Sequence, residues 1–322
     1  MNRSKRHPMP ACFRILPLVL FLILTQGVMA QPGKDQTEVI ISKKLSTEVT
    51  TVDVWLLSGQ SNMQGVGKVS DLPEDIPREI PNAWYWNQKE FEPLVLGKTK
   101  TSSRAGEFGP EVGFALGLAT PEHPVYLIKY HASGMPLHHG WHANQWQGAE
   151  PAPGRRNFYP GESAEDPNQG TLYQAMLKQY VAGIEHLKTQ HKSPVIRGFL
   201  WMQGEQDSKH ELSATTYAMS LKRLRDRLSS DLQVKKLPMV FGQVLPHEPA
   251  LERFTHRTEI RASMAAADAD SGSPDAIPLV KMVSTDGFEL LSDTVHYNAS
   301  GQLKLGRAMA ESLRSLVDLT SH

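Results

Sequence analysis

The stretch TVDVWLLSGQSNMQGVG, residues 51–67, decides the fold. Its first half is a short apolar run rich in β-forming residues, which predicts a buried strand. Small and polar residues then replace the apolar ones at residues 58–63. A hydroxyl group just past a buried strand lies where open α/β sheets place their ligands, so Ser61 is a candidate nucleophile. An ordinary strand-to-helix turn, with Ser61 or Asn62 capping the helix, fits the same residues.

The rest of the chain alternates between strand-like and helix-like patterns. Further apolar runs predict strands at residues 125–130, 195–202, 237–244 and 278–283, and a small hairpin at residues 83–86 and 91–94. Helical spacing predicts helices after Pro110 and at residues 172–187, 217–228, 255–267 and 299–317. This alternation predicts a parallel sheet covered on both faces. We therefore expect one domain over residues 51–322, an α/β/α sandwich around a parallel sheet of about five strands, with an inserted loop region near 135–168.

The first 30 residues are typical of a secretory signal peptide, with a basic start, an apolar run at residues 15–24 and small residues up to Ala30. We expect cleavage after Ala30, with an uncleaved anchor as the alternative, and a polar leader at residues 31–50. The single cysteine, Cys12, lies in the signal segment, so the mature chain has no disulfide. These features predict an exported protein, periplasmic or secreted, that is not held in a membrane once the signal is removed.

Composition and charge exclude several functional classes. Hydrophobic residues make up 40% of the chain and charged residues 21%, as in globular proteins that bury a core. The formal net charge is zero, which gives no electrostatic attraction to nucleic acid. The histidine-rich loop at residues 135–168 invites a metal interpretation, but its histidines lack an acidic partner or a second cluster at ligand spacing. We therefore predict no metal site.

Three predicted strand ends carry residues that can act together. They are Ser61, the turn at residues 203–205, and Asp293 with His296. A serine hydroxyl needs a base to take its proton, and that base needs a third group to fix its tautomer. The three-residue spacing lets one backbone turn bring the Asp293 carboxylate onto Nδ1 of His296, leaving Nε2 to face Ser61. Taken alone, this Asp-x-x-His pattern also fits a helix cap.

Four sequence blocks resemble a known family in kind and order. GQSNM at residues 59–63, GPE at 109–111, WMQGExD at 201–207 and DxxH at 293–296 are similar to the signature blocks of the SGNH-type hydrolases. They most resemble the acetylxylan esterase and sialate O-acetylesterase branch. The resemblance implies a flavodoxin-like sheet, no cofactor, and the removal of acetyl groups from sugar hydroxyls of an acetylated carbohydrate.

The resemblance also implies roles for individual residues. Ser61 matches the nucleophile, His296 the general base and Asp293 the carboxylate that orients it. Gly109 and Gln203 match donors of hydrogen bonds to the oxyanion, together with the backbone N–H of Ser61. Such donors, aimed at the developing charge, each lower the barrier by about 3 to 4 kcal/mol.

Other positions are assigned less uniquely. Glu205 matches a glutamate that shares or takes the orienting role in some relatives, or holds its loop by accepting backbone N–H bonds. Gln60 and Asn62 flank the serine and are expected to contact the substrate. Trp141, in the long loop, is a candidate for stacking on a sugar ring or for filling a local core. The chain departs from the family pattern at Met202 and in having Ser133-Gly134 in place of a double glycine, which puts the choice of substrate in doubt.

Two rival functions fit the same fold. A carbohydrate-binding protein without catalysis would keep the fold, but the presence of Ser61, Asp293 and His296 argues against it. An esterase acting on lipid or peptide esters would keep these residues, but no apolar lid-like segment is evident. The sequence therefore favours an exported carbohydrate O-acetylesterase of the acetylxylan type, with a sialate O-acetylesterase as the alternative.

Overall fold

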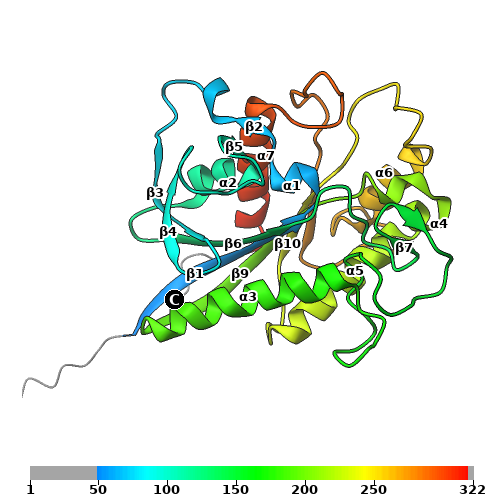
Figure 1. Cartoon of the computed structure of the whole chain (residues 1–322), viewed down its shortest axis with the longest axis horizontal. Helices are drawn as coiled ribbons and strands as arrows, with labels where there is room; N and C mark the ends of the chain where they lie inside the picture. Colours follow the sequence, from blue (N-terminus) through cyan, green and yellow to red (C-terminus); the bar gives the residue numbers. More distant parts are fainter. Residues whose placement is uncertain (1–48, 318–322) are drawn as a thin grey trace, which may run out of the picture. The chain divides into compact units, whose positions relative to one another are not determined.

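Strand β1 (Thr50–Gly59) lies at the centre of the sheet in the computed structural model, which describes residues 49–317 (Figure 1). It is buried from Val52 to its end. It pairs in parallel with β6 (Val125–His131) on one side and with β9 (Lys192–Met202) on the other. A strand enclosed on both edges and both faces reads as a continuous apolar run, which is why the sequence identified it.

The main sheet has seven strands in the order β11-β10-β9-β1-β6-β3-β4. The outer strands are β11 (Val280–Val283), β10 (Met239–Gly242), β3 (Glu79–Trp86) and β4 (Phe91–Val95). All neighbours pair in parallel except β3 and β4. The predicted sandwich around a parallel sheet is confirmed. The predicted count of about five strands is too low, because the hairpin joins the sheet through Ala83, which pairs with Val125 of β6.

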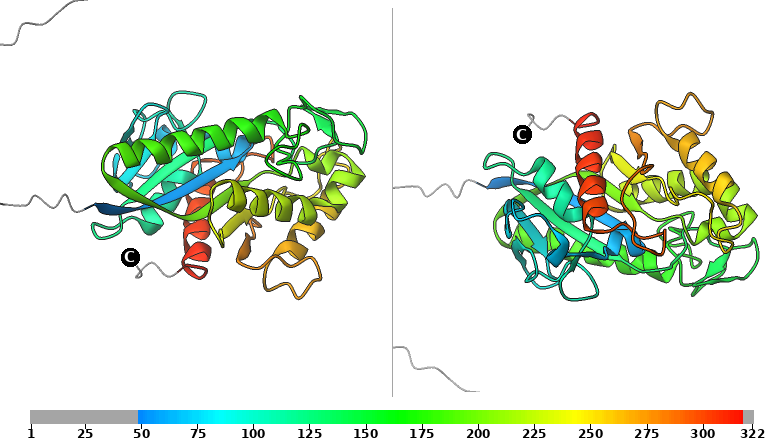
Figure 2. Two further views of the ribbon diagram at one scale, coloured as in Figure 1. Left: turned by 90° about the horizontal axis from the view of Figure 1, so that it is seen from below. Right: turned by 90° about the horizontal axis from the view of Figure 1, so that it is seen from above.

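Helices cover both faces of the sheet (Figures 1 and 2). The lower face in Figure 1 carries α3 (Thr171–Thr189) and α5 (Tyr217–Asp231), whereas α2 (Pro110–Leu118) and α7 (Ala299–Arg314) lie on the upper face. Helix α6 (Arg257–Ala267) packs beside α5 and β11. These helices match the five predicted from apolar spacing, with small shifts at their ends.

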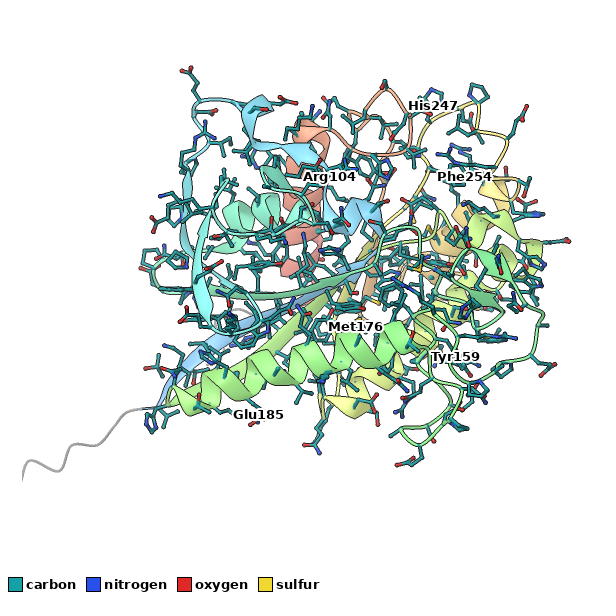
Figure 3. All side chains as sticks on the ribbon, in the orientation of Figure 1. Arg104, Tyr159, Met176, Glu185, His247 and Phe254 are labelled. Atoms are coloured by element: carbon teal, nitrogen blue, oxygen red, sulfur yellow. The ribbon has the colours of Figure 1, made fainter. Side chains whose placement is uncertain are left out.

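Helical spacing explains which side of each helix is buried. In α3 the apolar residues Leu172, Met176, Tyr180 and Leu187 recur after four, four and seven residues, that is after one, one and two helical turns, and are buried. Glu185, on the same helix, is exposed (Figure 3). Helices α2 and α7 cross at close range, because a Cβ atom added at Gly113 would lie 2.2 Å from the backbone oxygen of Leu303.

Short elements connect the main ones. They are α1 (Ser61–Gln64), α4 (Glu211–Thr215), the 3-10 turns η1 (Val69–Asp71) and η2 (Asp207–Lys209), and the two-residue strands β2 (Gly67–Lys68), β5 (Glu107–Phe108), β7 (Trp141–His142) and β8 (Gln145–Trp146). The loop region at residues 135–168 contains only the β7–β8 pair as regular structure.

Several predictions concern the ends of the chain. The signal peptide at residues 1–30 and residues 31–48 of the leader lie outside the described residues, whereas Thr50 already belongs to β1. All described residues fall in one unit, Thr47–His322. Within residues 49–317, no helix combines the length and the apolar character needed to cross a bilayer.

Candidate active site

The turn after β1 brings a serine to the carboxyl edge of the sheet. Gly59 has φ +151°, and a Cβ atom there would lie 2.0 Å from the carbonyl oxygen of Met202, so only glycine fits. The next N–H, of Gln60, donates to that same carbonyl oxygen at 2.9 Å. Ser61 then opens the four-residue helix α1. Close contact with β9 thus fixes the position of the serine.

His296 lies between the serine and a carboxylate. Its Nε2 is 2.8 Å from Oγ of Ser61, and its Nδ1 is 2.6 Å from Oδ2 of Asp293. One backbone turn thus places the Asp293 carboxylate beside Nδ1 of the ring. The other carboxylate oxygen, Oδ1, accepts the backbone N–H groups of Val295 and His296, both at 2.9 Å. Burial by itself would raise the pKa of Asp293, but these hydrogen bonds outweigh it, and the pKa is lowered.

The loop that carries this pair is strained. Thr294 has φ +58°, a conformation that costs energy for a β-branched residue. Its hydroxyl is buried and has no hydrogen-bond partner within residues 49–317. Strained residues of this kind persist only where the surrounding structure holds them, and they gather at functional sites.

Glu205 contacts Asn62 rather than the histidine. Its Oε1 accepts from Nδ2 of Asn62 at 2.7 Å, and its Oε2 is buried with no partner in the described part of the chain. Burial raises the pKa of Glu205, while the hydrogen bond from Asn62 and the nearby His296 act in the opposite direction. Of the two carboxylates proposed to orient the ring, Asp293 is the one in contact with it.

Asn62 joins α1 to the loop that carries His296 through buried hydrogen bonds. Besides Glu205, its Nδ2 donates to the backbone oxygen of Val295 at 3.0 Å, and its Oδ1 accepts the backbone N–H of Tyr297 at 3.1 Å. The side chain is 1% exposed. The prediction that Asn62 contacts the substrate is therefore wrong, because its polar atoms are engaged inside the protein.

Two of the three predicted oxyanion donors are already engaged. The N–H of Gly109 donates to Oε1 of Glu111 at 2.9 Å. Nε2 of Gln203 donates to Oδ2 of Asp207 at 2.6 Å and to the backbone oxygen of Met135 at 3.1 Å, and the residue is fully buried. The structure contradicts the predictions for Gly109 and Gln203, because neither retains a free N–H group. The backbone N–H of Ser61, in contrast, has no acceptor within residues 49–317.

Gly134 is a candidate donor that the sequence prediction missed. It follows β6 and lines the same cleft as Ser61, and its N–H has no acceptor in the described part of the chain. Gly134 has φ +68°, and a Cβ atom there would meet nothing within 4 Å, so the backbone, not packing, requires glycine. The Ser133-Gly134 pair, noted only as a departure from the family pattern, was the available signal.

The cleft above the serine encloses about 470 Å³. Besides Ser61, His296 and Gly134, its lining includes Gln60 and Glu205. Gln60 thus stays a predicted substrate contact.

The far wall of the cleft carries two cations and an aromatic ring. Lys209, Arg253 and Phe254 line it, and both cations lie over the Phe254 ring, at 5.7 and 4.8 Å from its centroid. Neither cation has a carboxylate within ion-pair distance in the described part of the chain. Burial lowers the pKa of Lys209, and the positive charge of Arg253 lowers it further.

Trp141 does not line the cleft. Its side chain is 4% exposed, its Nε1 donates to Oγ of Ser213 at 3.1 Å, and its ring packs edge-on against Trp146. The prediction that Trp141 stacks on a sugar ring is wrong, and the alternative of a local core fits. No group of three or more possible metal ligands occurs within residues 49–317.

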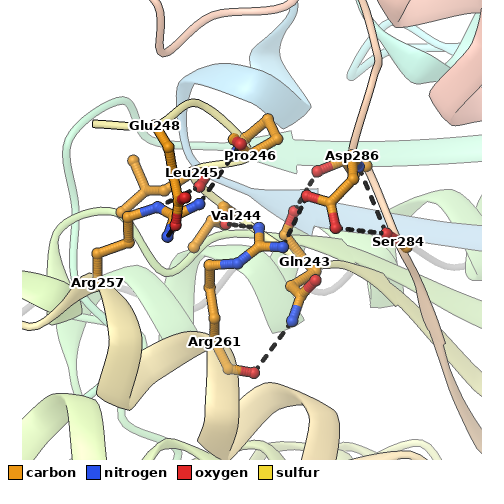
Figure 4. Close-up of polar contacts among 10 residues, drawn as sticks. Gln243, Val244, Leu245, Pro246, Glu248, Arg257, Arg261, Ser284 and Asp286 are labelled. Carbon is orange, nitrogen blue, oxygen red and sulfur yellow. Dashed lines mark hydrogen bonds and ion pairs between the residues drawn. The ribbon is translucent and has the colours of Figure 1, made fainter. Parts of the chain in front are cut away.

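Two arginines of α6 hold the loops that follow β10 and β11 (Figure 4). Arg257 donates through Nε to the backbone oxygen of Leu245 at 2.8 Å. Arg261 donates to the backbone oxygen of Val244 at 2.8 Å and to Oδ1 of Asp286 at 2.7 Å. One of these loops carries Phe254 and Arg253, and the other leads to His296, so α6 fixes both sides of the cleft.

The sheet order, with a serine after the central strand and a histidine before the last helix, defines an α/β/α fold that carries a serine, a histidine and an aspartate at the carboxyl edge of its sheet. More narrowly, the chain belongs to the family described as carbohydrate esterase, sialic acid-specific acetylesterase, whose model matches residues 51–315. It is thus a member of a family of carbohydrate acetylesterases.

Similar solved structures share the fold. A protein from Arabidopsis thaliana is 18% identical with a TM-score of 0.57, and the match covers 82% of this chain and 98% of that one. A carbohydrate acetylesterase from Xanthomonas citri is 18% identical with a TM-score of 0.52, covering 82% of this chain and 56% of that one. The protein NanS is 13% identical with a TM-score of 0.53, covering 83% and 98%. No functionally curated sequence matches the chain significantly.

Proposed function

We propose that the protein removes acetyl groups from sugar hydroxyls through an acetyl-enzyme on Ser61. The observation that carries the proposal is the continuous chain of contacts from Asp293 Oδ2 to His296 Nδ1, at 2.6 Å, and from His296 Nε2 to Ser61 Oγ, at 2.8 Å. Both distances suit proton transfer by a general base. Asp293 is the orienting carboxylate in this proposal, and Glu205 supports the site through Asn62.

The reaction takes two steps. Ser61 Oγ attacks the acetyl carbonyl carbon while His296 Nε2 takes the hydroxyl proton, and the lowered pKa of Asp293 keeps a carboxylate beside the resulting imidazolium. The tetrahedral intermediate collapses as His296 returns the proton to the sugar oxygen, which leaves as an alcohol. Water then attacks the acetyl carbonyl carbon while His296 takes one of its protons. His296 passes this proton to Ser61 Oγ as the ester bond breaks, which restores the serine hydroxyl and releases acetic acid, which ionises to acetate.

The oxyanion needs donors that are not already engaged. We propose the backbone N–H groups of Ser61 and Gly134, because both line the cleft and neither has an acceptor within residues 49–317. Each such donor lowers the barrier by about 3 to 4 kcal/mol when it is aimed at the developing charge. In this proposal Gln203 does not contact the oxyanion. Its side chain stabilises the turn after β9 by donating a hydrogen bond to Asp207.

The direct test is hydrolysis of 4-nitrophenyl acetate. Ser61→Ala and His296→Ala should each lower kcat by at least about a thousandfold, as expected when one member of a catalytic unit is removed. Ser193→Ala and His191→Ala are matched controls, because both residues are exposed near the start of β9, at the opposite edge of the sheet, and should change nothing. Near-normal activity in either site variant would refute the serine mechanism.

The cations of the cleft favour the second candidate, an esterase for acetylated acidic sugars such as sialic acid, over the neutral acetylxylan type. Lys209 and Arg253 converge on Phe254 without carboxylate partners in the described part of the chain, so a carboxylate of the substrate would neutralise them. A neutral xylan chain would leave both charges unpaired.

The two candidates differ in what the cations contribute. Arg253→Ala and Lys209→Ala should each raise KM for an acetylated sialic acid up to about fivefold, because a partly exposed ion pair with the substrate carboxylate, worth up to about 1 kcal/mol, is lost. KM for 4-nitrophenyl acetate should not change. The effect on sialic acid should weaken with salt. Two results together would favour the neutral candidate. Wild type would turn over acetylated xylose faster than acetylated sialic acid, and the variants would change neither the KM for acetylated sialic acid nor the KM for 4-nitrophenyl acetate.

A further inference from the structure

A second hollow opens at the same edge of the sheet, beyond the cleft. It encloses about 350 Å³ and lies at the carboxyl ends of β3 and β6, of which β6 pairs with β1, the strand that leads to Ser61. Its lining is polar and aromatic, with side chains from the β3–β4 turn, the loop after β4, the end of β6 and α3. The proposed hydrolysis uses none of these residues.

Tyr85 presents an unused hydroxyl to this hollow. The residue is 5% exposed, and its hydroxyl makes no hydrogen bond within residues 49–317, although it is not among the fully enclosed polar atoms. Burial, helped by the charges of Glu111 and Glu92, raises its pKa, so the hydroxyl keeps its proton. A buried phenol that makes no hydrogen bond in the protein and reaches an open hollow is set up to bond a ligand.

Other unused groups lie beside it. The hydroxyl of Tyr130 and the ring nitrogens of His131 also have no hydrogen-bond partner within residues 49–317. Burial, with the nearby Lys129, lowers the pKa of His131 to about 3, so its imidazole is neutral and offers one donor and one acceptor. The hollow therefore offers both donors and acceptors.

The charge of the hollow is small. Lys129 is buried, and its Nζ lies 2.6 Å from Oε2 of Glu111, which takes up its charge. Lys100 is the remaining cation of the lining, and no carboxylate lines the hollow. Hydroxyl, amide and imidazole groups around an aromatic floor suit an uncharged polyhydroxyl compound rather than a cation or a phosphate.

The side chain of Gln64 connects a residue of the hollow to a residue of the catalytic cleft. Gln64, at the end of α1, accepts through Oε1 from Ser103 of the hollow at 3.1 Å and from Ser133 of the cleft at 2.7 Å. One residue of each site is thus hydrogen-bonded to the same amide oxygen. A chain of linked sugars that crosses Gln64 would reach both sites.

We infer that this hollow, centred on Tyr85, binds a second sugar residue of the acetylated glycan while the acetylated residue sits at Ser61. The inference rests on the proposed function, and it makes the substrate an oligosaccharide or polymer rather than a free monosaccharide. Tyr85 acts here as a specificity residue and has no part in the chemistry.

The test compares substrates of increasing length. The series is built on whichever acetylated sugar, xylose or sialic acid, wild type turns over faster, bearing zero, one or two further sugar residues. Wild type should show at least a tenfold higher kcat/KM once one further residue is present. Tyr85→Phe should remove most of this gain and leave the acetylated monosaccharide and 4-nitrophenyl acetate unchanged.

Tyr126→Phe is the matched control, because Tyr126 is 6% exposed, lies on neighbouring β6 and lines a different hollow. Ser103 is exposed at the rim of the hollow, and Ser103→Phe would fill the hollow with a larger side chain. Like Tyr85→Phe, it should remove most of the gain in kcat/KM that a further sugar residue gives. Equal kcat/KM along the wild-type series, or equal effects of Tyr85→Phe and Tyr126→Phe, would overturn the inference.

Failure of the proposed function would look different, since wild type would then not hydrolyse 4-nitrophenyl acetate or Ser61→Ala would hydrolyse it at a near-normal rate. Calorimetric binding of the deacetylated trisaccharide to Ser61→Ala still tests the hollow in that case. Weaker binding to Ser61→Ala carrying Tyr85→Phe supports the sugar site, and unchanged or undetectable binding rejects it.

Discussion

Replacement of Asn62 by alanine tests whether buried hydrogen bonds hold the serine and histidine together. The side chain donates to Glu205 and to the Val295 carbonyl, and accepts from the Tyr297 N–H, at 2.7 to 3.1 Å. Asn62→Ala leaves three buried polar groups without their partner, and each such group costs about 1 to 3 kcal/mol. Because water can enter the space left by the amide, we expect the lower end of the sum, about 3 to 5 kcal/mol.

The loss should reach catalysis as well as stability. Asn62 links α1, which carries Ser61, to the backbone of the loop that carries His296. A displacement of about 1 Å between reacting groups can cost about a hundredfold in rate. We therefore expect kcat for 4-nitrophenyl acetate to fall about a hundredfold in the folded variant. The pKa of Glu205 should rise further, because the hydrogen bond from Asn62 that lowers it is gone.

Asn157 is a closely matched control. It is also 1% exposed, donates to the Trp141 carbonyl at 2.7 Å, and accepts the Tyr159 N–H at 3.1 Å, but it lies in the loop region 135–168. Asn157→Ala should lose similar free energy of unfolding in urea titrations and keep kcat within a few-fold. A loss below about 1 kcal/mol in Asn62→Ala, or equal kcat in the two variants, would refute this reasoning.

Two further predictions concern buried charges. Glu111→Gln should lower the free energy of unfolding by about 3 to 5 kcal/mol, because it leaves Lys129 buried and unpaired. Glu111→Leu with Lys129→Met should recover most of that loss in urea titrations, and a double variant as unstable as the single one would contradict the prediction. Burial raises the pKa of Asp207 from 3.8 to about 6, so the folded protein binds more protons between these values and the contribution of Asp207 to stability is lost as pH rises. The stability of wild type minus that of Asp207→Asn should fall by about 2.4 kcal/mol from pH 4 to pH 7, and a flat difference would reject this account.

The sequence predicted the sheet and helices wherever burial leaves a periodic or continuous apolar pattern. Strand β1 and helix α3 are examples, because local spacing reports directly which side is buried. The place of the β3–β4 hairpin could not be predicted. Its alternation indicates strands, but the pairing of Ala83 with Val125 depends on a partner 42 positions away that no local pattern identifies.

The site shows the same division between local and distant information. Asp293 and His296 could be joined from sequence because one backbone turn sets their geometry. The failures at Gly109 and Gln203 have another cause. Residue type indicates that a group can donate, but whether its hydrogen is free depends on neighbours such as Glu111 and Asp207, which also matched the pattern. Trp141 failed similarly, because its partner Ser213 is 72 positions away.

Chemistry and substrate choice are built from different parts of this fold. Ser61 and His296 are tied to the core through Asn62, so changes beneath them cost stability and rate together. Of the groups proposed to choose the substrate, Arg253 lies in the loop after β10 and Tyr85 lies at the carboxyl end of β3, and neither makes a hydrogen bond to the catalytic residues. Loops placed on a rigid sheet can change without unfolding it. Substitutions in these outer groups should therefore change which acetylated sugar is used while leaving the turnover of a small acetyl ester intact.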